Sequence, residues 1–336
     1  MNKLYLKTCL IILSFCFSQS LNQDEKEIQR FVENKTSEAI DLLEKIVNIN
    51  SGTLNIKGNQ KVGKILQKEL DKLGFNTYWV TYPKEVKRAG HLFAEMRGGK
   101  GKKITMVGHL DTVFEKDHPF QKFVRKGNKA YGPGVDDMKS GDVSMLYIMK
   151  ALNHIGKLKD MNLTLVFIGD EEKLGAHPSI VRKELIDAGK WADIGLGFEG
   201  ATGIETGTIA RRSASSWILT TTGIQGHSSR VFSETLGYGA IFEASRIINS
   251  FREELAEEEY LTFNPGVIVG GTDTNYDPVN ARGSADISFI APYVDAALAG
   301  MGPDGSGAHS EDEWLDLTSF PKTTTRSAIL IYRLTR

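Results

Sequence analysis

The chain has very little cysteine. Its only two cysteines, Cys9 and Cys16, lie among the first twenty of 336 residues. From residue 21 onward the sequence therefore excludes disulfide bonds and thiolate ligands. Any metal ion bound there has to be held by histidines and carboxylates.

An excess of charge of either sign is also missing. The 41 basic and 42 acidic residues are well mixed and give a net charge of −1. The sequence has no basic stripe to bind nucleic acid and no acidic tail, so we predict no nucleic-acid partner. With 40% hydrophobic residues and 34 glycines, the composition is typical of a loop-rich globular protein.

The longest apolar stretch near the start is too short to cross a bilayer comfortably. Lys3 and Lys7 precede the apolar run TCLIILSFCF, and the small residues of Ser18-Gln19-Ser20 follow it. This pattern predicts a signal peptide over residues 1–20, a secreted or periplasmic location, and no membrane association after its removal. A lipoprotein modified at Cys16 is the alternative, against which the bulky neighbour Phe15 argues.

Hydrophobic periodicity predicts alternating strands and helices, and hence an α/β domain. Its polar loops should follow the carboxyl ends of the strands. Strands are predicted over 75–82, 91–96, 104–110, 163–170 and 194–198, and helices over 24–48, 59–73, 142–155, 178–189 and 318–335.

The pattern changes near residue 211. An alternating strand over 215–223, a helix over 239–256 and a strand over 266–270 predict a small inserted α+β domain. The predicted division is therefore a first part of the main domain at 21–210, the insertion at 211–282, and a second part of the main domain at 283–336.

Five short motifs carry histidines and carboxylates. Because side chains alternate along a strand, His109 and Asp111 should point to the same face. Glu171 and Glu172 are adjacent at a strand end, so one can bind a metal while the other faces the reacting water. The motifs are GHLDT (108–112), GPGVDDMKSG (132–141), GDEEKLG (169–175), GFEGA (197–201) and GAHSEDEW (307–314).

Together these residues provide ligands for two metal ions. His109 and Glu199 would bind one ion and Glu172 and His309 the other, with Asp137 between them. Nitrogen and oxygen ligands without sulfur suit two Zn²⁺ ions, with Mn²⁺ or Co²⁺ as alternatives. The neighbouring Asp136 is predicted to be a solvated loop carboxylate, although spacing alone leaves the choice between the two aspartates open.

The motifs GHLDTV, GPGVDDMKSG, DEEKLG, FEG and GAHS, in this order, resemble those of the dizinc carboxypeptidase and aminoacylase family, peptidase family M-twenty, and especially its glutamate carboxypeptidase branch. The resemblance implies a mixed-sheet zinc-exopeptidase domain with helices on both faces. It also implies that Asp137 bridges the metals, that Glu171 is the general base and that Asp111 orients His109. A glutamate at position 199 goes with carboxypeptidase-type members.

The same resemblance implies that the insertion is a lid and dimerisation domain. His227 matches a lid histidine that contacts the reacting carbonyl, and Asn275 resembles a lid asparagine that holds the substrate carboxylate. After residue 282 the match jumps, so the lid lacks its second half and a carboxylate-binding arginine. Arg282 is a weak candidate to replace that arginine, and homodimer formation stays open.

Three functions are consistent with these features. The first is a metallo-exopeptidase that removes a C-terminal residue from small peptides or N-acyl amino acids. The second is a related dipeptidase or N-acyl amino acid deacylase with the same chemistry. The third is a catalytically defective metal-binding protein, because the lid is incomplete.

Overall fold

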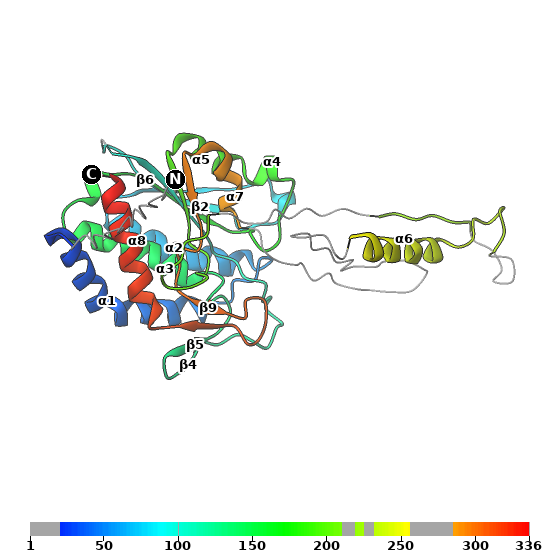
Figure 1. Cartoon of the computed structure of the whole chain (residues 1–336), viewed down its shortest axis with the longest axis horizontal. Coiled ribbons are helices and arrows are strands. Elements are labelled where there is room, and N and C mark those ends of the chain that lie inside the picture. Colours follow the sequence, from blue (N-terminus) through cyan, green and yellow to red (C-terminus); the bar gives the residue numbers. More distant parts are fainter. Residues whose placement is uncertain (1–20, 100, 210–218, 225–231, 256–284, 336) are drawn as a thin grey trace, which may run out of the picture.

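The protein is built around a six-stranded mixed sheet, seen in a computed structural model that describes residues 21–99, 101–209, 219–224, 232–255 and 285–335 (Figure 1). The strand order is β1-β2-β6-β3-β7-β8. β1 and β2 are antiparallel to their neighbours, whereas β6, β3, β7 and β8 run parallel to one another. The strands are β1 (Asn76–Val80), β2 (His91–Met96), β3 (Lys103–His109), β6 (Asn162–Ile168), β7 (Ile194–Gly197) and β8 (Ala296–Leu298).

Helices cover both faces of this sheet. Alternation along β3 sends Met106 into one buried cluster, with Leu146 and Phe320, and Val107 into a second cluster with Ile290. The predicted α/β fold with a mixed sheet and helices on both faces is therefore confirmed. The first face carries α1 (Gln23–Val47), α2 (Ile56–Lys72), α3 (Lys139–His154) and α8 (Ser319–Thr335), and the second carries α5 (Lys183–Trp191) and α7 (Ile287–Ile290).

Local capping explains where the first two helices begin. The Asn22 side chain accepts the Glu25 N–H at 2.9 Å, and the Glu25 carboxylate accepts the Asn22 N–H at 2.9 Å, which forms a capping box for α1. Asn55 caps α2 by accepting the Gly58 N–H at 3.2 Å. α2 thus begins three residues before the predicted start at residue 59.

A second, four-stranded antiparallel sheet brings distant motifs together. Its order is β4-β5-β10-β9, and Tyr131 of β5 pairs with Trp314 of β10. The loop that begins at Gly132 therefore lies beside the segment that ends at Glu313. The strands are β4 (Val124–Lys126), β5 (Lys129–Tyr131), β9 (Gly305–Ser306) and β10 (Trp314–Asp316).

Two predicted helices differ from the structure. The helix predicted over 178–189 is broken into α4 (Pro178–Val181) and α5 at Arg182, whose side chain is buried. The family resemblance also implies a loop and a helix over 283–300, but residues 285–300 form the short α7 and a 3₁₀ turn before they join the sheet as β8. Its small residues fit the sheet edge, where Ala297 pairs with Gly195. Single 3₁₀ turns lie at η1 (Lys84–Val86), η2 (Leu158–Asp160) and η4 (Ala291–Tyr293).

The described part of the insertion contributes one helix, α6 (Ala240–Leu255), close to the predicted 239–256. α6 buries none of its residues and lies apart from the sheet (Figure 1). Residues 219–223 of the predicted strand form no strand. The stems on either side of the insertion are joined by bridges between Thr208 and Ala299 and between Ala201 and Asp304.

Several predicted features lie outside the described residues. These are the signal peptide, the strand predicted over 266–270, and the two predicted substrate residues His227 and Asn275. Within the described ranges, none of the helices is long and apolar enough to cross a membrane.

Candidate metal centre

Four of the residues predicted for the metal site lie at the carboxyl ends of three parallel strands, at one edge of the main sheet. His109 is the last residue of β3, Glu171 and Glu172 follow β6, and Glu199 follows β7. Carboxyl ends of adjacent parallel strands lie at the same sheet edge, so polar residues placed there converge. Gly141 allows α3 to pack closely against the segment after β7. A Cβ at this position would lie 2.0 Å from the carbonyl oxygen of Phe198.

Asp137 lies between the two predicted metal-binding histidines. Its Oδ1 is 3.0 Å from Nε2 of His109, and its Oδ2 is 3.0 Å from Nε2 of His309. Nε2 of His109 is also 3.5 Å from Oε1 of Glu199, and Nε2 of His309 is 3.2 Å from Oε2 of Glu172. The structure therefore forms two histidine–carboxylate pairs that share one aspartate, in the grouping predicted from the sequence.

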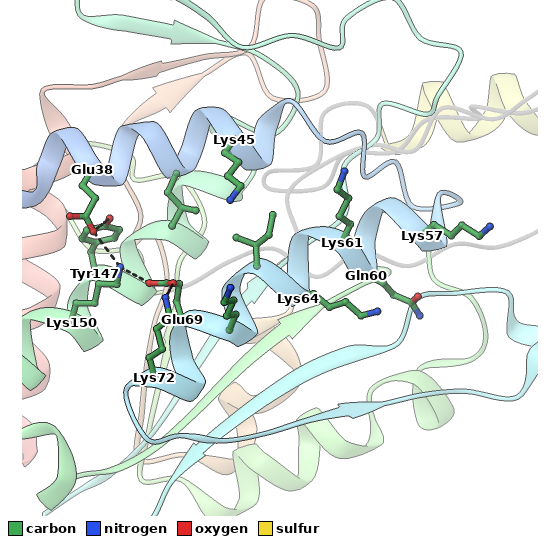
Figure 2. Close-up of a pocket in the computed structure, with 13 residues that line it drawn as sticks. Glu38, Lys45, Lys57, Gln60, Lys61, Lys64, Glu69, Lys72, Tyr147 and Lys150 are labelled. Atoms are coloured by element: carbon green, nitrogen blue, oxygen red, sulfur yellow. Dashed lines mark hydrogen bonds and ion pairs between the residues drawn. The ribbon is translucent and has the colours of Figure 1, made fainter.

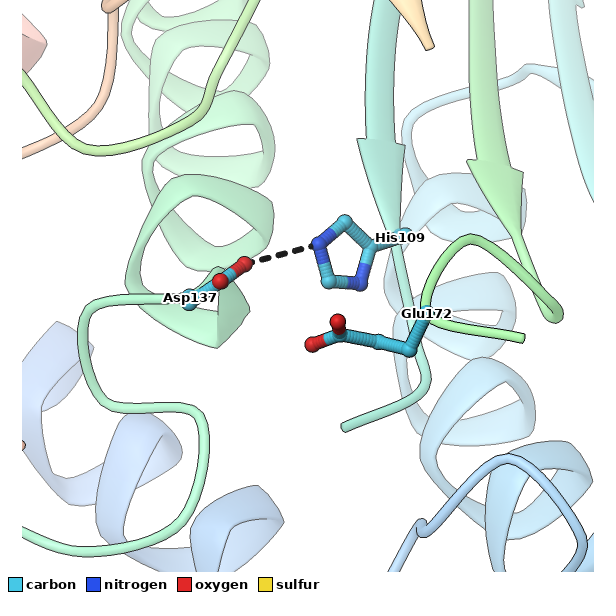
Figure 3. A group of neighbouring side chains, drawn as sticks. All are labelled: His109, Asp137 and Glu172. Carbon is cyan, nitrogen blue, oxygen red and sulfur yellow. Dashed lines mark hydrogen bonds and ion pairs between the residues drawn. The ribbon is translucent and has the colours of Figure 1, made fainter. Parts of the chain in front are cut away.

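These distances fit metal coordination. Zinc bonds to nitrogen and oxygen are about 2.0–2.1 Å long, so two ligand atoms of one tetrahedral ion lie roughly 3.4 Å apart. One ligand atom from each of His109, Asp137 and Glu172 lies within 4.8 Å of the others, and Figure 3 shows these side chains facing a common space. Their geometry and chemistry therefore fit a divalent cation.

The orientation of His109 leaves Nε2 available as a ligand. Its Nδ1 is 3.0 Å from the backbone carbonyl of Asp111 and 3.5 Å from Oδ1 of the same residue. In the neutral ring an N–H at Nδ1 donates to that carbonyl, which leaves the lone pair on Nε2, the atom that faces Asp137 and Glu199. The orienting acceptor closest to His109 is thus the main chain of Asp111.

The Asp111 carboxylate holds the loop that carries the two glutamates. It accepts the backbone N–H groups of Glu171 and Glu172, each at 3.1 Å, and the hydroxyl of Thr53 at 2.7 Å. Asp111 is fully buried. It therefore positions both glutamates relative to His109. Thr53 was not singled out in the sequence, because its partner lies 58 residues away.

The centre has more negative than positive charge. Burial, followed by the charge of Asp137, raises the pKa of Glu172 to about 7. Hydrogen bonds to Asp137 and Glu172 raise the pKa of His309 to about 10. Burial alone would lower the pKa of His109, but the carboxylates of Glu199, Asp111 and Asp137 outweigh it and raise that pKa well above its usual value. Such a site favours the binding of cations.

Glu171 lies in surroundings that increase the proton affinity of its carboxylate. Burial raises the pKa of Glu171 well above its usual range, and the charges of Asp286, Glu199 and Glu172 raise it further. The charge of His109 acts in the opposite direction. A carboxylate whose pKa is raised is a stronger proton acceptor than an ordinary glutamate, as a general base requires.

Glu313 joins two of the motif loops and was missed in the sequence. It is buried, and its carboxylate accepts the backbone N–H groups of Gly134 at 3.1 Å, Asp136 at 2.9 Å and Asp137 at 3.1 Å. It thereby fixes the loop of Asp137 to the segment of His309. In the sequence Glu313 follows two other acidic residues, and only the pairing of β10 with β5 distinguishes it from them.

The structure also corrects the prediction for Asp136. Asp136 is buried, with only 8% of its surface exposed to solvent, and is not a solvated loop carboxylate. Burial, together with the charges of Glu313 and Asp137, raises the pKa of Asp136 to about 8. Asp137 is the member of the pair that faces both histidines. Glu313 accepts the backbone N–H groups of both aspartates and so fixes the path of this loop. That path turns the side chain of Asp137, and not that of Asp136, toward the histidines.

His309 adopts an uncommon backbone conformation. Its φ is 65°, in the left-handed region that residues other than glycine rarely enter. Gly307, two residues earlier, has a φ of 82°, and a Cβ there would lie 2.7 Å from the carbonyl oxygen of Asp312. Such conformations concentrate at functional sites, where the surroundings hold them in place.

A separate groove of about 800 Å³ lies between α1 and α2 (Figure 2). None of its lining residues belongs to the five motifs. Lysines dominate its rim, and Lys150 forms ion pairs with Glu69 at 2.9 Å and Glu38 at 3.5 Å. These pairs are partly exposed to solvent, and surface ion pairs of this kind contribute little to stability. The groove therefore does not compete with the metal centre as the candidate site.

Comparison with known proteins agrees with the geometry. The model of "Peptidase family M20/M25/M40" matches residues 105–333. The chain belongs to this family. The resemblance seen in the five motifs is thus confirmed, and the matched region contains every predicted metal ligand.

Individual relatives support the same assignment. The chain is 30% identical over 257 residues to carboxypeptidase G2 of Pseudomonas sp. (strain RS-16), covering 74% of this chain and 59% of that protein. It is 30% identical over 219 residues to aminoacylase-1A of Rattus norvegicus, covering 57% and 51%. The chain therefore spans about half to three fifths of the length of these relatives.

The fold is similar to solved structures of peptidases. A tripeptidase from Staphylococcus aureus superposes with a TM-score of 0.64 at 16% identity, covering 90% of this chain and 99% of that chain. At this identity the likeness supports the fold alone.

Proposed function

We propose that this protein is a zinc-dependent exopeptidase that hydrolyses the C-terminal peptide or amide bond of small peptides or N-acyl amino acids. The observation that carries the proposal is Asp137, whose two oxygens each lie 3.0 Å from a different histidine. Each histidine in turn lies beside a further carboxylate, and Glu171 lies next to one of these, Glu172. The resemblance to carboxypeptidase G2 supports the choice of a carboxypeptidase-type reaction.

In this proposal, His109 and Glu199 hold one zinc ion, Glu172 and His309 hold the second, and Asp137 is shared. Bound divalent cations supply Lewis-acid polarisation and make water acidic enough to lose a proton near neutral pH. Mn²⁺ and Co²⁺ are alternatives to zinc with the same ligands.

The protein's own groups then move the protons. Glu171 accepts a proton from the water that attacks the scissile carbonyl and delivers it to the leaving nitrogen. The Asp111 carboxylate keeps Glu171 in place by accepting the backbone N–H of Glu171. His227 and Asn275 are proposed to contact the substrate from the insertion, as donors to the carbonyl and to the substrate carboxylate.

Glu171→Gln tests the proposed function. The variant retains shape and metal ligands but loses the base, so we expect hydrolysis of an N-acyl glutamate to fall by about 10²- to 10⁴-fold. Zinc content, measured by atomic absorption, should stay unchanged. Glu85→Gln, at an exposed position, is the matched control and should keep full activity. Full activity of Glu171→Gln, or of chelated protein, would exclude this mechanism.

A second candidate is an N-acyl amino acid deacylase or dipeptidase, which the resemblance to aminoacylase-1A favours. A panel of N-acyl amino acids and dipeptides, compared by kcat/KM, separates it from a carboxypeptidase. A protein that binds two zinc ions but hydrolyses no member of the panel would instead be a metal-binding protein without activity.

The location and assembly of the protein are part of the proposal. The signal peptide predicted over residues 1–20 places it in the secreted or periplasmic space, where small peptides are its substrates. Fractionation of the producing cells tests the location. Gel filtration with light scattering distinguishes a monomer from the homodimer that the lid resemblance leaves open.

A further inference from the structure

Arg182 is a buried arginine that the reaction proposed above does not use. It lies at the break between α4 and α5, and its side chain is 1% exposed. A charged side chain is rarely buried to this extent without specific partners, because its removal from water is energetically costly. Its contacts therefore indicate what it is for.

The guanidinium joins two aspartates that are far apart in sequence. Its Nη1 donates to Oδ1 of Asp170 at 2.6 Å, and its Nε donates to Oδ1 of Asp286 at 2.8 Å. Nη2 donates to the backbone carbonyl of Asp170 at 3.1 Å. The planar fork of an arginine can satisfy these three acceptors at once, whereas a lysine ammonium cannot match their arrangement.

Asp170 closes the loop that carries the proposed base and one proposed ligand. Its Oδ2 accepts the Gly175 N–H at 3.1 Å, so the two ends of the segment 170–175 are held together. Glu171 and Glu172 lie inside this closed segment, immediately after Asp170. Arg182 holds both the side chain and the main chain of Asp170, and so it fixes the start of the loop, whereas Asp111 holds the next two residues.

Asp286 belongs to the segment by which the chain re-enters the sheet after the insertion. Its neighbour Ile287 is buried with Val107 and Ile168, which lie on β3 and β6 next to the metal centre. The ring of Phe289, from the same segment, lies 5.5 Å from the Arg182 guanidinium. The anchor of Arg182 is therefore part of the folded core.

We propose that Arg182 is a positioning residue that couples the segment following the insertion, through Asp286, to the Glu171–Glu172 loop, through Asp170. The inference rests on the proposed function for the roles of the two glutamates. It predicts that weakening this contact selectively disturbs the ion held by Glu172 and His309, because His109 and Glu199 lie on other segments.

Arg182→Lys is the informative substitution, since it keeps a positive charge between the two buried aspartates and removes only the fork. Zinc is titrated calorimetrically into the chelator-stripped full-length protein. We expect two binding events in the original protein, one of which weakens by about 10- to 100-fold in the variant while the other is unchanged. In the loaded variant, kcat should fall by a similar factor with KM retained, because base and ligand are misplaced but substrate contacts are not.

Arg333→Lys is the matched control. Arg333 forms an ion pair with the buried Glu25 at 2.6 Å, between α8 and α1, and its replacement should leave both binding events and kcat unchanged. If Arg182→Lys fails to fold, Asp286→Ala replaces it, because Arg182 then keeps Asp170 as its partner. A loss of about tenfold at the same ion is expected for that variant.

Two results would overturn the positioning role. The first is a folded Arg182→Lys variant that binds both ions as the original protein does. The second is equal weakening of both ions, which general loosening of the fold would produce. The zinc titration needs no substrate, so it decides this inference even if the original protein hydrolyses nothing, a result that would contradict the proposed function alone.

Discussion

The sheet body and the insertion differ in how they hold their side chains. In the body, α3 buries thirteen of its sixteen residues, and large side chains such as Phe167 are inaccessible to solvent. In the described part of the insertion, α6 buries none, and Ile241 and Phe242 are 65% and 62% exposed. Tertiary packing, which supplies most helix stability in proteins, therefore supports α3 much more than α6 within the described residues.

The difference separates two parts of the proposed reaction. Every predicted metal ligand and the proposed base come from the body, where Asp111 and Glu313 hold the motif loops by backbone hydrogen bonds. Both predicted substrate residues, His227 and Asn275, come from the insertion. In the proposed reaction, the chemistry therefore rests on a closely packed framework, whereas the proposed substrate contacts belong to the insertion.

The largest effect is expected when Asp137, the carboxylate shared by the two proposed metal sites, is replaced. Because each oxygen of Asp137 faces a different histidine, we expect Asp137→Asn to retain no zinc after dialysis, whereas Glu199→Gln should retain one ion. Atomic absorption of the purified proteins measures both. Asp295→Asn, at a side chain that is 74% exposed, is the control and should retain two ions. Two ions retained in Asp137→Asn would mean that the body does not bind them through this residue.

Stability should follow the same division. Leu146 on α3 is fully buried, so Leu146→Ala should lower the free energy of unfolding by about 2–5 kcal/mol. Phe242→Ala on α6 should change it by less than about 0.5 kcal/mol. Urea unfolding followed by circular dichroism gives both values. A large loss in Phe242→Ala would show that α6 packs against a partner surface in solution.

The link between two motif loops gives a smaller effect. Glu313→Gln keeps one oxygen for the N–H groups of Asp136 and Asp137 but places an amide NH₂ group opposite the Gly134 N–H. We expect the affinity for zinc to fall by about 10- to 100-fold, as measured by calorimetry. Glu311→Gln, whose side chain is 64% exposed, should bind zinc as the original protein does.

The smallest effect concerns pH. Burial raises the pKa of both Asp136 and Glu313 to about 8. A carboxyl with a higher pKa in the folded state stabilises the fold at low pH, and that contribution is lost as the pH rises through the folded value. We expect the Tm of chelated protein to fall by a few degrees between about pH 4.5 and 8, and zinc to reduce this fall. Scanning calorimetry with and without zinc measures the Tm at each pH. A Tm of the chelated protein that rises over this pH range would contradict the prediction.

The sequence predicted the main strands of the body and the position of the site, but not the side-chain contacts that hold the motif loops together. Continuous apolar runs over 104–110 and 163–170 predicted the buried strands, and the polar motifs that follow them predicted where the site lies. The two residues of β9 and three of β10 are too few to show a period. Glu313 and Arg182 each have a partner more than 100 residues away, Asp136 and Asp286 respectively, and no local pattern encodes such contacts.

The aspartates show the same limit. Adjacent Asp136 and Asp137 are equivalent in composition, and only the three-dimensional path of their loop buries one and turns the other toward the histidines. The break at Arg182 was hidden for a similar reason. The residues on either side of Arg182 have the periodicity of one continuous helix. The helix is nevertheless interrupted at Arg182, because its side chain binds two buried aspartates.

The paired stems of the insertion have an evolutionary consequence. Thr208 and Ala299 exchange backbone hydrogen bonds of 3.1 and 2.9 Å, so the chain leaves and rejoins the body beside the same sheet edge. Insertions between such neighbouring points are tolerated well, because a longer or shorter excursion leaves the surrounding fold undisturbed. Recombination at this junction would therefore exchange the insertion while the sheet body, with its proposed metal centre, is inherited unchanged.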